Sequence, residues 1–101
     1  MTIIWTTTAR QFLREIRDYI ATDSPSRADK HTIQIIDKVD LLAVTPRIGR
    51  EPSELEGSGI LQIMHGNYRI LYRISDESLI YVLAVIHCSR DFKRLRLDLS
   101  I

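Results

Sequence analysis

Hydrophobic positions recur with a helical period in the first half of this 101-residue chain. A short β-branched and aromatic run at Thr2–Trp5 comes first and predicts a strand. Apolar residues then recur every three or four positions in two stripes, the spacing that places them on one face of a helix. The first stripe is Ala9, Phe12, Leu13, Ile16, Tyr19 and Ile20, and the second is Ala28, Ile35, Ile36, Val39, Leu42 and Ala43.

The two predicted helices begin and end at residues suited to those positions. Thr8 and Gln11 have the spacing of a capping box, in which each side chain binds an otherwise unpaired backbone N–H. Ser24 suits the N-cap of the second helix, and Pro25 suits its first helical position, where a missing N–H costs nothing. The second helix should end before Pro46. Because the connection between the helices is short, we expect an antiparallel helical hairpin.

The second half of the chain has the pattern of strands. A polar loop covers residues 47–58, and strands are predicted at 59–65, 68–74 and 79–87, with turns at 66–67 and 75–78. The last strand is almost continuously apolar, which favours a central position covered on both faces. The predicted fold is therefore α+β in the order β-α-α-β-β-β, with the helical hairpin packed on one face of a small antiparallel sheet.

Pairing the strands by their turns assigns each side chain to a face of the sheet. With Tyr68 opposite His65 and Ile74 opposite Leu79, alternate residues share a face. The face expected under the helices holds Leu61, Ile63, Tyr68, Ile70, Tyr72, Ile74, Tyr81, Leu83 and Val85. The opposite face holds Ile60, Gln62, Met64, Arg69, Leu71, Arg73, Ile80, Val82 and Ala84. An apolar surface that carries arginines is typical of a protein-binding groove, although such arginines are often only solvated or paired with an acid.

The C-terminal residues alternate strictly between polar and apolar. Leu95, Leu97, Leu99 and Ile101 share one side of this strand-like segment. Three placements for residues 95–101 are consistent with the pattern: an extra edge strand of the same sheet, a contact in a homodimer, and a frayed tail.

Composition narrows the class of protein. The length suits a single domain over residues 1–101. The net charge is only +1, whereas nucleic-acid-binding proteins usually carry a clear basic excess, so direct nucleic-acid binding is expected to be weak or indirect. A single cysteine, Cys88, allows no internal disulfide and suits a reducing compartment. No apolar run is long enough for a membrane-spanning helix, so we expect a cytoplasmic protein without membrane contact.

No sequence motif indicates a metal, a cofactor or a nucleophilic centre. The three histidines, His31, His65 and His87, are scattered along the chain with no cysteine or acid at ligand spacing, so neither metal nor cofactor is expected. His87 and Cys88 would not form a nucleophilic pair, because adjacent residues of a strand point to opposite faces. By itself, His87 at a strand end is more typical of a structural residue than of a general base.

Several short motifs, in this order, resemble those of the ParE branch of the RelE/ParE toxin superfamily. The resemblance extends from Trp5 to about Leu95 and includes Ala9, the segments 18–21, 23–25 and 46–50, the Tyr68-Arg69-x-x-Tyr72-Arg73 strand and His87-x-x-Arg90-Asp91. It implies the toxin of a bacterial type II toxin–antitoxin system, a protein that causes growth arrest. It also implies a cognate antitoxin as partner, whose disordered tail folds along the toxin surface. The residues implied in binding the target or the antitoxin are Arg69, Arg73, His87 and Arg90.

The superfamily divides by target, and this chain resembles the ParE branch more closely. ParE-type members inhibit DNA gyrase by binding, whereas RelE-type members cut messenger RNA on the ribosome. Ile60 and Gln62 stand where RelE-type toxins place lysines, and no tyrosine follows Arg90. A phosphoryl-transfer site without those cations lacks most of its charge stabilisation. We therefore expect a gyrase-binding toxin with no catalytic residues.

Two alternatives stay open from the sequence. The first is a ribosome-dependent mRNA endoribonuclease of the RelE type, in which Arg69, Arg73, His87 and Arg90 contact RNA. The second is a degenerate, non-toxic member that still binds its antitoxin.

Overall fold

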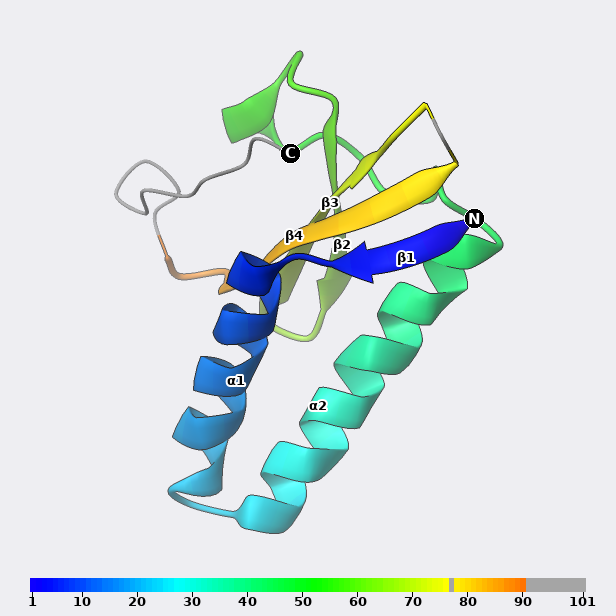
Figure 1. Ribbon diagram of the computed structural model, residues 1–101. Coiled ribbons are helices and arrows are strands. Elements are labelled where there is room, and N and C mark those ends of the chain that lie inside the picture. The colour runs from blue at the N-terminus through cyan, green and yellow to red at the C-terminus, as the bar shows by residue number, and fades with distance from the viewer. Residues whose placement is uncertain (77, 91–101) are drawn as a thin grey trace.

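The structure is a computed structural model and describes residues 1–76 and 78–90. Its elements follow the predicted order β-α-α-β-β-β (Figure 1). The helices and strands are β1 (Thr2–Trp5), α1 (Thr7–Ala21), α2 (Pro25–Asp40), β2 (Ile60–His65), β3 (Tyr68–Ile74) and β4 (Leu79–His87). Two short 3-10 helices, η1 (Leu41–Ala43) and η2 (Ser53–Leu55), lie between α2 and β2.

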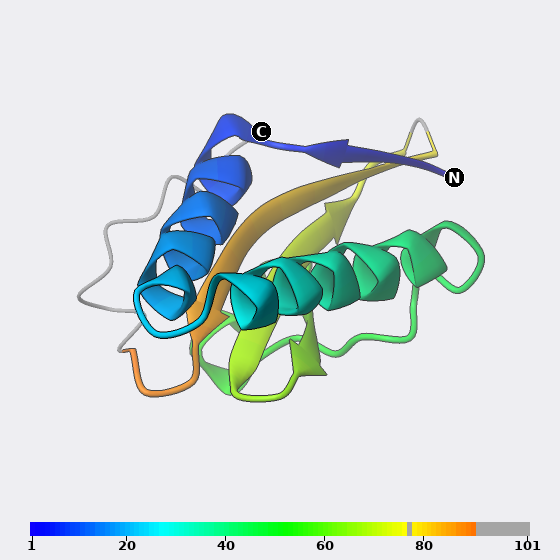
Figure 2. The same ribbon diagram turned by 90° about the horizontal axis from the view of Figure 1, so that it is seen from below.

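The four strands form one sheet in the order β1-β4-β3-β2. Strands β2, β3 and β4 are antiparallel neighbours, as predicted, and β1 lies parallel to β4 at the edge, so the sheet is mixed. The central position of β4 explains its nearly continuous apolar sequence. The two helices run antiparallel to each other and cover one face of the sheet (Figure 2).

Tertiary contacts decide where α1 begins. Its N-cap is Thr6, whose Oγ1 accepts a hydrogen bond from the Ala9 N–H at 3.1 Å. The Thr6 hydroxyl also donates to the Val82 carbonyl of β4 at 2.8 Å. The capping box predicted at Thr8 is therefore wrong, because the bond to β4 holds Thr6 at the end of the helix and starts α1 two residues earlier. The predicted cap of α2 is confirmed: the Ser24 hydroxyl accepts from the Arg27 N–H.

The turn between β3 and β4 shifts the pairing of these strands by one residue. Ile74 lies opposite Ile80, not Leu79 as predicted. The Ser75 N–H donates to the Leu79 carbonyl at 2.7 Å, and Ser78 has a left-handed φ of 64°. A left-handed residue at the end of a hairpin loop adds a residue to one strand, and a one-residue slip moves every side chain to the other face.

A β-bulge in β4 shifts the register a second time. Tyr72 lies opposite Val82, but the preceding residue, Leu71, lies opposite Ala84, so Leu83 has no partner of its own. Bulges of this kind re-aim the side chains beside them. The predicted faces of four β4 residues were therefore wrong: Ile80 and Val82 belong to the core under the helices, and Tyr81 and Leu83 to the opposite face.

Apolar side chains are buried on both faces of the sheet. The core under the helices consists of Ala9, Ile35, Val39, Leu42, Ile63, Ile70, Tyr72, Ile80, Val82 and Val85. The opposite face, here called the outer face, holds a second cluster of Ile60, Leu71, Leu83, Ala84 and Ile86, each at most 2% exposed. Leu55 of η2 and Phe12 of α1 pack against that cluster. The predicted apolar groove on this face is therefore wrong, because its aliphatic side chains are already buried.

Tyr72 ties the loop before β2 to the sheet. Its buried hydroxyl donates to the Pro46 carbonyl at 2.8 Å and accepts from the Gly49 N–H at 2.9 Å. Gly49 must be a glycine, because a Cβ there would lie 2.5 Å from the Tyr72 hydroxyl and 2.6 Å from the Gln62 carbonyl oxygen. Arg50 then exchanges two backbone hydrogen bonds with Gln62 on the edge of β2.

The strand expected at 95–101 lies outside the described residues. Among the residues that the structure describes, no helix is long and apolar enough to cross a membrane.

Replacing Tyr72 tests the role of its hydroxyl. Tyr72→Phe removes two hydrogen bonds and leaves the Gly49 N–H and the Pro46 carbonyl without their partner. We expect a loss of about 1–3 kcal/mol in the free energy of unfolding, measured by urea denaturation. Tyr81→Phe is the control, since the Tyr81 hydroxyl has no hydrogen-bond partner among the described residues. Equal losses in the two variants would contradict this role.

Candidate functional site

The structure places the four residues singled out by the sequence in two separate sites. Arg69 and Arg73 lie on β3 and project on the outer face of the sheet, where their neighbours across the strands include Met64, Ile86, Ile60 and Tyr81. His87 ends β4 opposite Tyr68, and Arg90 follows in the turn beyond it. Because Tyr68 belongs to the face under the helices, His87 points away from the two arginines.

Arg69 is held by an acid on the outer face. Its Nη1 lies 2.9 Å from Oε2 of Glu54, which belongs to η2. The two side chains are 20% and 31% exposed, so the pair is partly shielded from water. The pKa of the Glu54 carboxyl is lowered mainly by a hydrogen bond from the backbone N–H of Glu54 itself. The Arg69 guanidinium lowers it further. The sequence offered no signal for Glu54, because fifteen positions separate it from Arg69.

His87 and Arg90 line a cavity between α1 and the end of β4. This cavity, here called the strand-end pocket, has a volume of about 410 Å³. Its walls are mainly apolar and aromatic, with one charge of each sign from Glu15 and Arg90. The lining residues are Phe12, Glu15, Ile16, Tyr19, Tyr68, Val85, Ile86, His87, Ser89 and Arg90. A pocket of this kind is suited to hold an apolar side chain of a protein partner.

The His87 ring is fixed by two neighbours. It stands edge-on to the Tyr68 ring, with 5.2 Å between ring centroids. Its Nδ1 accepts from the Ser89 N–H at 3.1 Å and lies 2.7 Å from the Ser89 hydroxyl. An Nδ1 that accepts from a backbone N–H carries no proton, so the neutral ring has its proton on Nε2. His87 therefore has the structural contacts expected of a residue at a strand end.

The three histidines, which are scattered along the sequence, lie near one another in the folded chain. The His31 ring on α2 lies 5.1 Å from the His65 ring and 5.2 Å from the Tyr68 ring, and Tyr68 contacts His87. The pairing of His65 with Tyr68 across the turn could be predicted from the sequence, but the approach of α2 could not. In the described part of the chain, no group of three or more His, Cys, Asp or Glu residues is placed to hold a metal ion.

The environment of His31 disfavours its charged form. Burial, then the nearby His65 and Arg27, lower the pKa of His31 below its ordinary value of 6.5. The His31 Nε2 atom is buried and has no hydrogen-bond partner among the described residues. Burial, and after it Tyr19, raise the pKa of Tyr68, so that this ring also stays neutral.

Almost the whole chain matches a known protein family. Residues 3–92 match the model of the ParE toxin of the type II toxin–antitoxin system parDE. The chain belongs to the ParE toxin family. It is therefore a toxin of the type II toxin–antitoxin class, as the sequence motifs implied. Both candidate sites of this ParE-family toxin lie within the matched segment.

Two solved structures of toxin–antitoxin systems share the ParE-like fold. The chromosomal ParDE system of P. aeruginosa contains a chain that is 24% identical, with a TM-score of 0.71; the match covers 86% of this chain and 95% of that one. The toxin–antitoxin complex RelBE2 of Mycobacterium tuberculosis contains a chain that is 30% identical, with a TM-score of 0.59 and coverage of 85% and 95%. No curated protein sequence matches the chain.

The pKa of His31 predicts how the stability of this ParE-family toxin depends on pH. The unfolded chain binds a proton at His31 more readily than the folded chain does, so stability is lost as the pH falls through and below about 6.5. We expect His31→Phe, which keeps a ring beside His65 and Tyr68, to reduce that loss. Urea unfolding at about pH 8 and about pH 5.5 measures it. Identical pH dependence in the wild type and the variant would exclude His31 as the cause.

Proposed function

We propose that this ParE-family toxin inhibits DNA gyrase by binding to it, and that a cognate antitoxin neutralises it by covering its surface. The observation that carries the proposal is the chemistry of the outer face of the sheet. That face holds a buried apolar cluster, and Glu54 offsets the charge of Arg69 at 2.9 Å. Such a face is poorly suited to phosphoryl transfer, and its partly exposed arginine and acid are suited to polar contacts with a protein.

A ribonuclease site would need several cations around the reacting phosphate. Catalysis of phosphoryl transfer rests mainly on positioning and on charge stabilisation. At the positions where the resemblance places the lysines of RelE-type toxins, the chain has Ile60 and Gln62 on β2. Ile60 is 2% exposed, so its side chain is part of the hydrophobic cluster and not of a substrate surface. These features support binding over cleavage.

Both structural relatives support an antitoxin as partner. Each was solved as part of a toxin–antitoxin system, and the chain belongs to a family defined by such a system. The strand-end pocket offers an opening for an apolar side chain of that partner. Tyr19 at its rim is 76% exposed, so its ring is accessible to that partner.

The second candidate function is cleavage of messenger RNA on the ribosome, as in RelE-type toxins. The observation in its favour is the 30% identity with a chain of the RelBE2 complex. Under this alternative Arg69, Arg73, His87 and Arg90 contact RNA. The two arginine-bearing sites point in different directions, so a single phosphate could not contact all four residues.

Controlled induction of the toxin in bacterial cells separates the two targets. We expect plasmid supercoiling to fall and a DNA-damage response to begin, while messenger RNA stays intact. Gel analysis of a reporter plasmid and end-mapping of translated messages measure the two effects. Cleavage of messages with normal supercoiling would replace the gyrase proposal with the ribonuclease, and the absence of both effects would indicate a non-toxic member.

Arg69 and Glu54 form a matched pair for testing the outer face. We expect Arg69→Ala and Glu54→Gln each to cost less than about 1 kcal/mol in the free energy of unfolding, because the pair is partly exposed. Arg69→Ala should also raise the concentration needed for half-inhibition of gyrase supercoiling by about tenfold, the loss of one charge-assisted contact. Glu54→Gln keeps the arginine and should inhibit normally. If both variants inhibit equally well, the pair serves only the fold.

A further inference from the structure

The end of α2 carries the most exposed aliphatic side chains in the described part of the chain. Val44 is 83% exposed, Ile48 is 66% exposed and Leu41 is 62% exposed. The three lie within eight residues, where α2 continues into η1 and a turn, beside the start of β1 (Figure 1). We call them the helix-end patch. Exposed apolar residues that cluster in this way mark a site of interaction with another protein.

The local backbone structure holds these side chains together. The Leu41 carbonyl accepts hydrogen bonds from the N–H groups of Val44 and Thr45, at 3.1 and 3.0 Å. Side chains three residues apart in a 3-10 turn are eclipsed, so Leu41 and Val44 project on the same side. The Thr45 carbonyl accepts from the Ile48 N–H at 3.3 Å, which keeps Ile48 next to that turn. Residues 45–48 also line an apolar cavity of about 490 Å³, which gives room for a partner's side chain.

The helix-end patch is fixed to the body of the protein on both sides. The N-terminal ammonium of Met1 donates to the Ala43 carbonyl at 3.1 Å. Beyond the patch, the Tyr72 hydroxyl binds the Pro46 carbonyl and the Gly49 N–H. A surface that is already held in one conformation loses little conformational entropy when it binds, so this patch is prepared for a partner.

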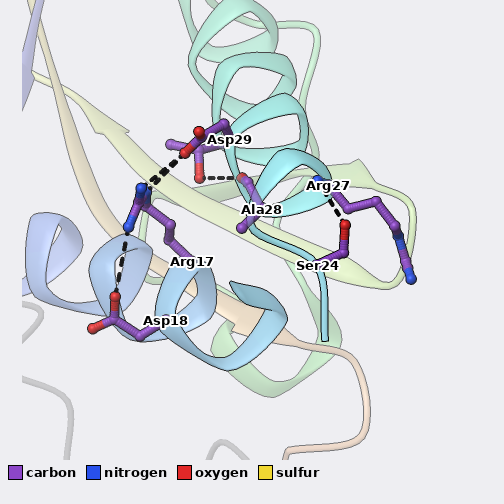
Figure 3. A network of polar contacts seen from close by, with 7 residues as sticks. Arg17, Asp18, Ser24, Arg27, Ala28 and Asp29 are labelled. Carbon is purple, nitrogen blue, oxygen red and sulfur yellow. Dashed lines mark hydrogen bonds and ion pairs between the residues drawn. The ribbon is translucent and has the colours of Figure 1, made fainter. Parts of the chain in front are cut away.

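Opposite charges lie on the two sides of the patch. Asp37 and Asp40 precede it on α2, and Arg47 follows it in the turn. All three are exposed, and none has an ion-pair partner among the described residues. Between the two helices, by contrast, opposite charges do pair: the Arg17 Nε and Nη2 atoms lie 3.1 and 2.9 Å from Oδ1 of Asp29 (Figure 3). An apolar centre with acids on one side and a base on the other is complementary to itself.

We propose that the helix-end patch joins two copies of this toxin in a twofold-symmetric dimer. Both copies of such a dimer use the same surface, so the acidic side of each patch meets the basic side of the other. Val44 packs against its counterpart near the axis, and Asp40 of each copy faces Arg47 of the other. Arginine suits this contact because its guanidinium group binds a carboxylate through two parallel hydrogen bonds. A partner of a single charge sign would leave one side of the patch unmatched.

The solution mass of the purified toxin tests the dimer. Stable interfaces bury about 1,200–2,000 Å², which is more than three aliphatic side chains supply, so we expect a weak dimer. In sedimentation equilibrium, the mean mass should rise from 11.7 kDa at about 5 μM toward twice that value at about 500 μM. Because the toxin is measured alone, the result does not depend on the identity of its target.

Two kinds of variant test the contacts. Val44→Asp places like charges at the axis and should keep the mass at 11.7 kDa at every concentration. Asp40→Arg places two arginines opposite each other and should weaken the dimer by about tenfold. Arg47→Asp, combined with Asp40→Arg, exchanges the two charges and should restore the Kd to within about threefold of the wild type. The Asp40 side chain makes no capping hydrogen bond to η1, so its replacement removes no cap.

Two exposed residues outside the patch supply matched controls. Ile33→Asp introduces an acid in place of an aliphatic residue of α2 that is 58% exposed. Arg14→Asp reverses an exposed charge on α1. Both variants should dimerise as the wild type does, and circular dichroism of each variant establishes that the helices are intact.

Each outcome supports or overturns the dimer. A constant mass of 11.7 kDa for the wild type up to about 500 μM would overturn it. If Val44→Asp dimerises as the wild type does, the copies meet through another surface and the inference is wrong. If the charge exchange does not restore the dimer, the twofold pairing of Asp40 with Arg47 is wrong. If the wild type stays monomeric and Val44→Asp weakens gyrase inhibition, the patch contacts the target and not a second copy.

Discussion

The burial of β4 on both faces is the constraint on which the rest of the structure depends. This strand lies between β1 and β3, and its side chains contribute to both hydrophobic clusters. Burying one large aliphatic side chain contributes roughly 1.5–3 kcal/mol to the stability of the fold. A strand buried on both faces therefore stabilises the elements that pack against each side of it. It pairs with β1, and its Val82 carbonyl accepts hydrogen bonds from the N–H and the hydroxyl of Thr6, which begins α1.

Burial of both faces leaves few polar side chains on the sheet itself, and most of them lie at its margins. Polar side chains that could contact a partner lie at the ends of strands, as His87 does, or on the helical layer, as Arg10 does. On the outer face itself, Arg69 forms an ion pair with Glu54 of η2. Three separate cavities lie around the closed core of this small toxin, among them the strand-end pocket. Such an arrangement suits a partner that wraps around the molecule.

The same fold brings like charges together and compensates them unevenly. Asp29 of α2 neutralises Arg17, whereas Arg10 and Arg14, two turns and one turn earlier on α1, have no acidic partner among the described residues. The His31 ring lies 5.1 Å from the His65 ring, and burial, followed by the charges of His65 and Arg27, lowers the pKa of His31. Uncompensated charge of this kind weakens a fold slightly, and it is available for binding a partner of opposite sign.

Hydrophobic periodicity determined the order and type of the elements. The positions of β1, the cap of α2 at Ser24 and the strand turn at Gly66 all follow from local rules, because backbone geometry there depends on neighbouring residues alone. The family motifs also lie in the sequence, and through them the toxin class could be recognised.

Only the tertiary structure decided the register of β4, the start of α1 and the composition of the sites. A left-handed residue at Ser78 and the bulge at Leu83 each change the face on which side chains lie, and neither has a reliable signal in the sequence. Thr6 became the cap because β4 supplies a second hydrogen bond to it. Contacts between residues far apart in the chain, such as Arg69 with Glu54, arise from packing, and packing energies depend on all the elements at once. Local sequence therefore specified the pieces of this protein, and the long-range packing around β4 decided which side chains meet.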